Sequence, residues 1–160
     1  MVLSDPEPAV RVGAVRAVAS LAPQMAEATL RQKIAAGDTS SEVMDECFRA
    51  LIQVNREDSI PLIATFLLSR EVGEYAAFAL GESRDSSALE ILKQAYHERL
   101  QVRQVLIQAI GLVRSRDTVD FLIDVIRDDN ETNAEVAYNA MESYGDSDYK
   151  RARQAFIDRI

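Results

Sequence analysis

The chain has one histidine and one cysteine, the two side chains from which catalytic sites are most often built. His97 is followed by Glu98, but a di-iron centre of the His-Glu type needs several such pairs, which one histidine cannot supply. We expect this pair to lie at a solvated helix end. Cys47 shares its place in an internal repeat, described below, with small or apolar residues, so we expect a core residue rather than a nucleophile. We therefore predict no catalytic residue, metal site or cofactor, and no enzymatic activity.

The charge distribution narrows the classes of partner. The formal net charge is −8 at pH 7. A protein that binds nucleic acid or an anionic membrane needs a basic face, and so does the DNA-binding groove of a glycosylase. We therefore expect a protein partner, not a nucleic acid or a membrane. From Asp117 to Asp148 there are ten acidic residues and one basic residue, Arg127. This segment is either a solvated face or a docking surface for a basic partner.

Length and composition predict one soluble domain, residues 1–160. An apolar fraction of 48% and a charged fraction of 28% are typical of globular proteins. No apolar run approaches the ~18–20 residues that span a membrane, and the start, MVLSDPEPAV, lacks the features of a signal peptide. A single cysteine cannot form an internal disulfide, so a reducing compartment, the cytoplasm, is expected.

A repeat of about 30 residues organises the chain. Five segments align on a valine at their second position: Val10, Val43, Val72, Val102 and Val136. Seven positions later each has a small residue: Ala17, Ala50, Ala79, Ala109 and Ser143. The next position is large: Val18, Leu51, Leu80, Ile110 and Tyr144. Cys47 aligns with Ala14, Ala76, Leu106 and Ala140.

Between these segments lies a second amphipathic pattern, as in SIPLIATFLL and TVDFLIDVI, with apolar residues at steps of three and four. Residues that favour helix starts fill the breaks: Asp5-Pro6, Asp58, Asp85-Ser86-Ser87, Asp117-Thr118 and Asp146-Ser147. The chain is therefore predicted to form about ten helices in five hairpins, residues 6–39, 40–69, 70–99, 100–131 and 132–160. Paired helices at such a period are typical of a solenoid.

The segments EVGEYAAFALGESRDSSALEILKQA and QVRQVLIQAIGLVRSRDTVDFLIDVI resemble the short bacterial HEAT-like repeat of phycobilisome lyase subunits. That pattern runs roughly V-R-x-x-A-x-x-A-L-G-x-x-x-D-x-x-A-x-x-x-L. The resemblance implies an all-α fold, a right-handed α-α superhelix, and a role as a protein-interaction scaffold or adaptor. A bilin lyase or pigment-handling subunit is the alternative. The arginine after the valine occurs only in units one and four, as Arg11 and Arg103.

Gly81, Gly111 and Gly145 follow the large residue in three copies. A glycine inside a helix costs about 1 kcal/mol relative to alanine, so a shared position calls for a reason. The glycines either allow neighbouring helices to approach closely or end the first helix of each hairpin.

A partner-binding strip can be placed on the face opposite the predicted core. With the valine as position zero, positions 0, 4, 5, 7 and 8 are expected to be buried, and position 6, flanked by 2, 3 and 10, to face outward. HEAT-like solenoids place the second helix of each hairpin on the inside of their curve, and the resemblance implies that the valine helices line this concave face. The strip comprises Arg49, Glu74, Tyr75, Phe78, Gln104, Val105, Gln108, Tyr138 and Glu142. Packing of Tyr75 and Phe78 against adjacent helices is the alternative.

The two ends differ in their apolar character. The first helix is apolar nearly all round, through Val10, Val12, Val15, Val18 and Leu21, which caps a solenoid poorly. Self-association through this helix, or a place within a longer protein, is therefore expected. The last helix has one apolar stripe, formed by Ala152, Phe156 and Ile160.

Overall fold

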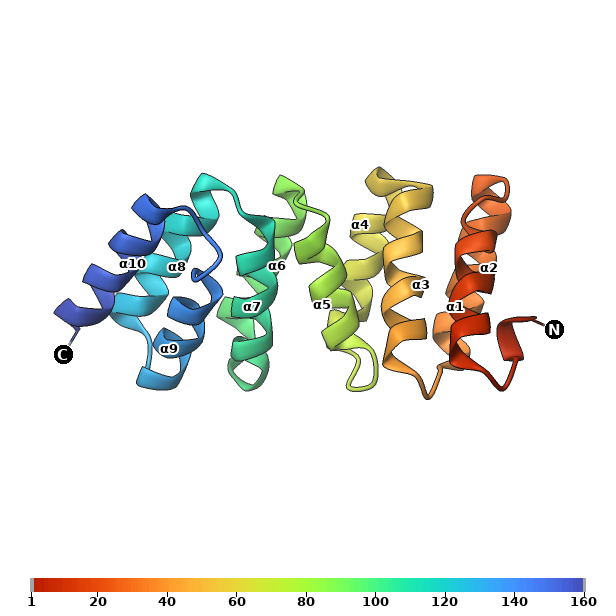
Figure 1. Ribbon diagram of the computed structural model, residues 1–160, viewed down its shortest axis with the longest axis horizontal. Helices are drawn as coiled ribbons and strands as arrows, with labels where there is room; N and C mark the ends of the chain where they lie inside the picture. Colours follow the sequence, from red (N-terminus) through yellow and green to blue (C-terminus); the bar gives the residue numbers. More distant parts are fainter. Residues whose placement is uncertain (1, 160) are drawn as a thin grey trace. The chain divides into compact units, whose positions relative to one another are not determined.

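The computed structural model describes residues 2–159, without the side chain of Leu100, and the regular structure in this range is helical throughout (Figure 1). The all-α fold predicted from the sequence is confirmed. No helix among these residues has both the length and the hydropathy needed to cross a membrane. The ten α-helices of this range are α1 (Pro8–Val18), α2 (Pro23–Ala36), α3 (Ser41–Val54), α4 (Arg56–Ala64), α5 (Gly73–Glu82), α6 (Ser86–Glu98), α7 (Arg103–Val113), α8 (Arg116–Asp128), α9 (Glu131–Ala140) and α10 (Asp146–Asp158). Three short 3-10 segments join them: η1 (Val2–Ser4), η2 (Thr65–Leu68) and η3 (Leu100–Val102).

Polar side chains define several of the helix starts. Asp85 accepts a hydrogen bond from the backbone N–H of Ser87 at 2.8 Å, and so caps α6. The side chain of Ser115 accepts from the backbone N–H of Thr118 at 3.1 Å, and the Thr118 side chain accepts in return from Ser115, which makes a capping box for α8. Each predicted repeat range accordingly holds two α-helices, except that α9 begins one residue earlier than predicted.

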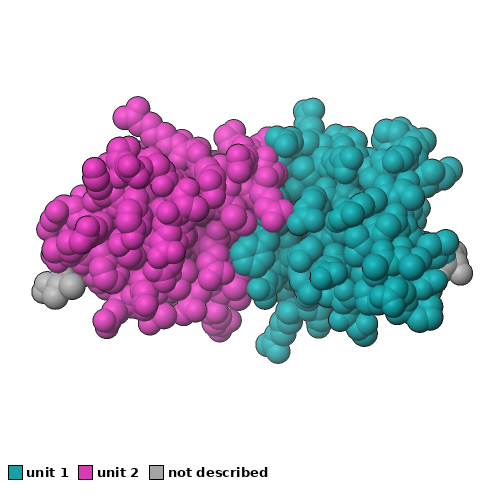
Figure 2. Space-filling model, in the orientation of Figure 1, with its two compact units in different colours: residues 1–79 teal, residues 80–160 magenta. Residues whose placement is uncertain are grey.

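The chain divides into two compact units, residues 1–79 and 80–160, and α5 begins in the first and ends in the second (Figure 2). In unit 1, α3 packs against α1, α2 and α4. Its apolar residues form the centre of the unit, because Val43, Cys47, Phe48 and Leu51 are each 0% exposed. The ring of Phe48 also meets that of Phe66, in η2, edge to face at 5.5 Å.

Unit 2 is built from α6 to α10 and the end of α5. Here α7 packs against α6, α8 and α9, and α10 packs against α8 and α9. Its core is mainly aliphatic and includes Leu92, Ile107, Ile110, Leu122 and Ile126, all 0% exposed. First helices thus pack on first helices, α1 on α3 and α7 on α9, and among the second helices α8 packs on α10.

The buried face of the first helices differs from the predicted one. Position 5 is buried in every copy: Val15, Phe48, Ala77, Ile107 and Met141. The prediction for position 0 is wrong for Val10 and Val102, which are each 41% exposed. Val102 lies before the start of α7, in η3, so it is not on the helix face at all. Position 1 is buried in four copies, as Arg11, Met44, Gly73 and Ala137, so the core direction is rotated toward positions 1 and 5.

Position 7 separates the middle of the chain from its ends. Ala50, Ala79 and Ala109 are buried, whereas Ala17 and Ser143 are exposed. In α1, Val15 is buried while Val10 is exposed, and Leu21, just beyond the end of the helix, is exposed too, so this segment does present apolar side chains to solvent. Self-association through this surface stays a prediction. In α10, Ala152 is buried and Phe156 half-buried, and Ile160 lies outside the described residues.

Two of the three repeat glycines allow close approach of helices within unit 2. A Cβ added at Gly81 would overlap the carbonyl oxygen of Ala109 in α7, and one at Gly111 would lie 2.9 Å from the Cβ of Ala140 in α9. Real Cβ atoms essentially never come this close to such neighbours. Gly145 differs, because it precedes α10 and a Cβ there would meet nothing within 4 Å. Close approach therefore explains the first two glycines and not the third.

Candidate functional site

The predicted strip is divided between the two units. In unit 1, Tyr75 and Phe78 are half-buried on α5, and Glu74 beside them is exposed. Arg49 is exposed on α3, and its guanidinium donates to the carboxylate of Glu46 at 3.3 Å. The two aromatic rings of this part are thus partly accessible and partly packed.

The strip residues of unit 2 are of two kinds. Gln104 and Gln108 are exposed on α7 with Val105 half-buried near them, and Glu142 is exposed just beyond α9. Tyr138 is different, because its ring stacks on Tyr149 at 5.4 Å and on Phe156 at 5.0 Å, both in α10. The Tyr138 and Tyr149 hydroxyls also share a hydrogen bond of 2.7 Å. Tyr138 therefore joins the last two helices to each other.

A carboxylate beyond the end of a second helix organises each unit. In unit 1 this is Asp38, which follows α2. Both oxygens accept from Arg11, from Nε at 2.9 Å and from Nη2 at 2.8 Å, and Nζ of Lys33 lies 2.7 Å from Oδ2. The backbone N–H of Ser40 also donates to it at 2.9 Å. These hydrogen bonds, that of Arg11 above all, hold the pKa of Asp38 well below its usual range against the effect of burial.

In unit 2 the corresponding carboxylate is Asp129, which follows α8. It accepts hydrogen bonds from the hydroxyl of Tyr96 in α6 and from Arg103 Nη1 in α7, the latter at 3.4 Å. The Arg103 guanidinium also stacks over the Tyr96 ring, 4.7 Å from its centroid. Burial acts to raise the pKa of Asp129, but its hydrogen bonds from Tyr96 and from the backbone of Asn130 outweigh this and lower it. Burial and the bond to Asp129 raise the pKa of Tyr96.

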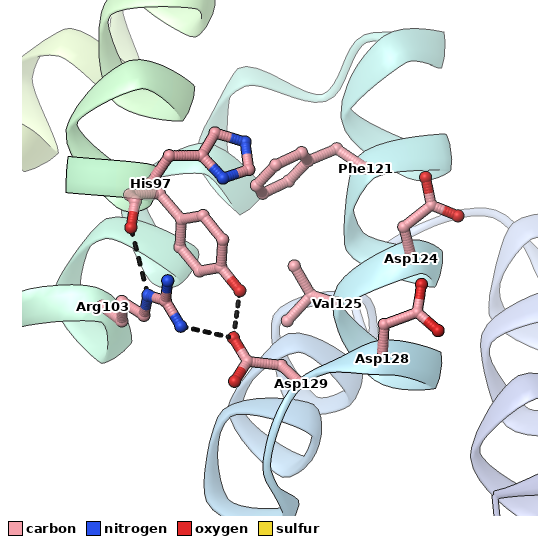
Figure 3. A pocket seen from close by; sticks show the side chains of 8 residues that line it. His97, Arg103, Phe121, Asp124, Val125, Asp128 and Asp129 are labelled. Atoms are coloured by element: carbon pink, nitrogen blue, oxygen red, sulfur yellow. Dashed lines mark hydrogen bonds and ion pairs between the residues drawn. The ribbon is translucent and has the colours of Figure 1, made fainter. Parts of the chain in front are cut away.

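A cavity of about 300 Å³ opens beside Asp129. Figure 3 shows His97 and Arg103 on one side of it, and Phe121 and Val125 from α8 on the other. The ring of Phe121 meets those of Tyr96 and His97 edge to face, with centroids 5.2 Å and 6.1 Å away. Asp124 and Asp128 complete the lining from α8. His97 thus lies at an exposed helix end, as expected, and also forms part of an aromatic wall.

Asp124 and Asp128 form an acidic rim to this cavity. Both are exposed, and in Figure 3 their carboxylates lie on the outer side of α8, away from Arg103. Among residues 2–159 neither carboxylate has a hydrogen bond or an ion pair. The cavity therefore combines partly exposed rings with two free negative charges, an arrangement suited to binding a cation rather than to acid–base chemistry.

Comparison with protein-family models gives two matches. A model described as HEAT repeats matches residues 1–74, and one described as PBS lyase HEAT-like repeat matches residues 72–98. The chain is a HEAT-like repeat protein. No curated protein matches it significantly.

The prediction that the valine helices line a concave face follows from a family rule for the second helices of hairpins. The valine segments belong to α1, α3, α5, α7 and α9, which are the first helices of their hairpins. The family rule therefore does not assign the predicted strip to the inner side. The cavity is formed largely by α6 and α8, which are second helices.

The cavity is not among the sites predicted from the sequence, although the sequence contains signals for parts of it. Arg103 matches the arginine of the family pattern, and Asp124, Asp128 and Asp129 belong to the acidic segment. Tyr96 is buried and Phe121 half-buried, on two different helices. The helical period within each helix does not show that these two rings contact each other. The separation of 33 residues between Tyr96 and Asp129 equals about one repeat, which is the signal that could have linked them.

Proposed function

We propose that this HEAT-like repeat protein is a non-catalytic interaction module, a scaffold or adaptor that binds a protein partner. The observation that carries the proposal is the cavity of unit 2, where aromatic rings and free carboxylates meet on second helices. HEAT-like repeats usually serve in protein interaction, which supports the same role. The net charge of −8 favours a protein partner over a nucleic acid or a membrane surface.

The side chains best suited to catalysis support a non-catalytic role. Cys47 is fully buried, and burial raises the pKa of its thiol to about 12, so almost no thiolate forms at neutral pH. His97 contacts the aromatic rings of Tyr96 and Phe121 rather than a nucleophile. An assay that finds turnover abolished by Cys47→Ala or His97→Gln would contradict the proposal.

Site-specific photo-crosslinking tests the interaction directly. Benzoylphenylalanine is introduced in separate cultures of the native host at position 121 in the cavity, at position 78 in the strip and at Gln32, which is exposed on α2. We expect one discrete crosslinked protein from position 121 and none from position 32. Equal products from positions 121 and 32, or none from either 121 or 78, would contradict the proposed function.

The strip of unit 1 is the alternative surface, and Phe78 is its anchor. Interface hot spots favour partly exposed aromatic residues surrounded by polar ones. If the partner binds there, Phe78→Ala weakens binding by about 1–3 kcal/mol with little change in thermal stability. A large fall in the melting temperature would instead make Phe78 a packing residue.

A pigment-handling role is the second candidate, and the match of residues 72–98 to the PBS lyase HEAT-like repeat favours it. Incubation of the protein with a bilin and an apo-phycobiliprotein tests this role through the absorbance of the adduct. Specific pigment attachment, absent from a control without the protein, would replace the adaptor proposal.

A further inference from the structure

The cavity of unit 2 has the size of a site for one side chain. Its volume of about 300 Å³ lies at the lower end of the range of roughly 300–1,000 Å³ for small-molecule sites. Its walls come from the end of α6, the start of α7 and one face of α8 (Figure 3). An extended partner segment can therefore insert a side chain between α6 and α8 while its backbone stays outside.

The positive charge already present in the cavity is neutralised within the protein. Arg103 Nη1 bonds to Asp129 at 3.4 Å, and its Nε donates to the backbone carbonyl of Tyr96 at 3.1 Å. Its Cζ also lies over the Tyr96 ring, 4.7 Å from the centroid, so this guanidinium is held on three sides. Arg103 and Asp129 together therefore add no net charge to the cavity.

Two negative charges remain. Asp124 and Asp128 are four residues apart on α8, so they lie on one helix face, and neither is paired within the described range. The cavity therefore attracts a cation. The bonded Asp38 of unit 1 provides a contrast, since its carboxylate already holds two cationic side chains.

The aromatic wall favours a flat cation over a compact one. Phe121 is half-buried, so part of its ring is accessible, and Nζ of Lys93 already lies 5.8 Å from its centroid. Arg103 on Tyr96 shows that a guanidinium stacks on a ring in this same cavity. Nζ of Lys93 is also paired with Glu90 at 3.2 Å, so an ammonium group can meet a ring and a carboxylate together. A guanidinium does so with a flat face on the ring and N–H donors in a fixed plane at its edge, a geometry that an ammonium group lacks.

We propose that this cavity receives an arginine side chain from a basic segment of a protein partner, stacked on Phe121 and bonded to Asp124 or Asp128. The inference rests on the proposed function and names the chemistry of the partner.

Capped tripeptides test this chemistry without the natural partner. Acetyl-Gly-Arg-Gly-amide is titrated at low salt into the full chain and followed through the amide signals of Asp124 and Asp128 and the ring signals of Phe121. The same peptide with citrulline in place of arginine has nearly the same shape but no charge. The lysine peptide has the positive charge but not the planar guanidinium group. We expect the arginine peptide to bind about three- to tenfold more tightly than the lysine peptide. The citrulline peptide should bind more weakly than both.

A pair of matched double variants locates the effect. Asp124→Asn with Asp128→Asn removes the rim charges, and Asp117→Asn with Glu135→Gln removes two exposed charges of the same unit outside the cavity. The first should weaken binding of the arginine peptide about three- to tenfold, and the control less than about twofold. Circular dichroism checks that both variants keep their helices and melting temperature.

Several outcomes would overturn the inference. Equal binding of arginine and citrulline peptides would exclude a cation site, and equal losses in the two double variants would reduce the effect to net charge. A protein crosslinked at position 121 with no arginine preference would overturn this inference and leave the proposed function. Arginine binding at the cavity with no crosslinked protein would overturn the proposed function, because the cavity would then lack a protein ligand.

Discussion

Asp38 and Asp129 occupy comparable positions in the two units, but their carboxylates bond to different sets of side chains. Each follows a second helix and bonds an arginine from the start of a first helix, Arg11 or Arg103, 27 and 26 residues away in sequence. In unit 1 a second cation, Lys33, shares the carboxylate. In unit 2 a tyrosine takes that place, and a cavity opens beside it.

The residues just before each aspartate account for much of the difference. Lys33 comes five residues before Asp38 and reaches its carboxylate. Asp124 and Val125, five and four residues before Asp129, cannot supply a cation. The same arginine–aspartate contact therefore closes the end of one hairpin, and in the other leaves acidic side chains available to a partner. The same repeat feature is thus fully ion-paired in unit 1 and borders two free carboxylates in unit 2.

The largest effect is expected from the core of unit 1. Phe48→Ala removes a fully buried ring and should cost about 3–5 kcal/mol. Because repeats are stabilised mainly by their neighbours, hydrogen exchange should accelerate most in α1 to α4. Ile107→Ala, at the same repeat position in unit 2, is the counterpart and should accelerate exchange in α6 to α9. Equal acceleration along the whole chain from either change would show that the two units unfold as one.

A smaller loss is expected from the close helix contact in unit 2. Gly81→Ala places a Cβ against the carbonyl oxygen of Ala109, so α5 and α7 must separate, at a cost of about 1–3 kcal/mol. Urea denaturation measures this cost. Gly145→Ala is the matched control, because the added methyl meets open space. A Gly81 variant as stable as the parent would leave helix ending as the role of this glycine.

Tyr96→Phe should have a still smaller effect. It keeps the ring against Phe121 and removes the hydroxyl that donates to Asp129, at a cost of about 1–2 kcal/mol. Tyr75→Phe is the control, since no hydrogen bond to the Tyr75 hydroxyl occurs among residues 2–159. Thermal melts of both variants make the comparison. A loss as large for Tyr75 as for Tyr96 would mean that the Asp129 contact adds no stability.

The last prediction concerns the dependence of stability on acid pH. It has almost no effect at neutral pH, because it appears only near the ordinary aspartate pKa of about 3.9. The folded protein lowers the pKa of Asp38, so the stabilisation is present above that value and is lost as the pH falls through the lowered pKa. Asp129 has the same sign, but burial opposes its hydrogen bonds more strongly. Asp38→Asn should therefore flatten the fall in urea midpoint between pH 5 and about pH 2 more than Asp129→Asn. The reverse order would contradict the comparison.

The parts of the fold that depend on helical period were predictable. Position 5 of the repeat was expected to be buried and is buried in all five copies, and Cys47 lies in the core as predicted. The hairpin ranges enclose the observed helices to within one residue, because helix-start residues mark the breaks. Periodicity determines these features locally, with no knowledge of what a helix packs against.

Features that depend on contacts between hairpins were not predictable in the same way. The repeat valine is buried as Val43 but exposed as Val10 and Val102, and Val102 precedes its helix. Tyr138 was assigned to a binding strip, yet its ring stacks on two rings of α10. Asp38 and Asp129 lie beyond helix ends, where no period applies, so their arginine partners could be recognised only in three dimensions.

The burial of Cys47 has a practical consequence for chemical modification. With a thiol pKa of about 12 and no exposed surface, the native cysteine is expected not to react with maleimides at neutral pH. A new cysteine at an exposed position such as Gln32 or Gln154 can then be conjugated alone, with the natural core left intact. Dyes, spin labels or resin linkers can thus be attached to either unit without first replacing a residue of the interior.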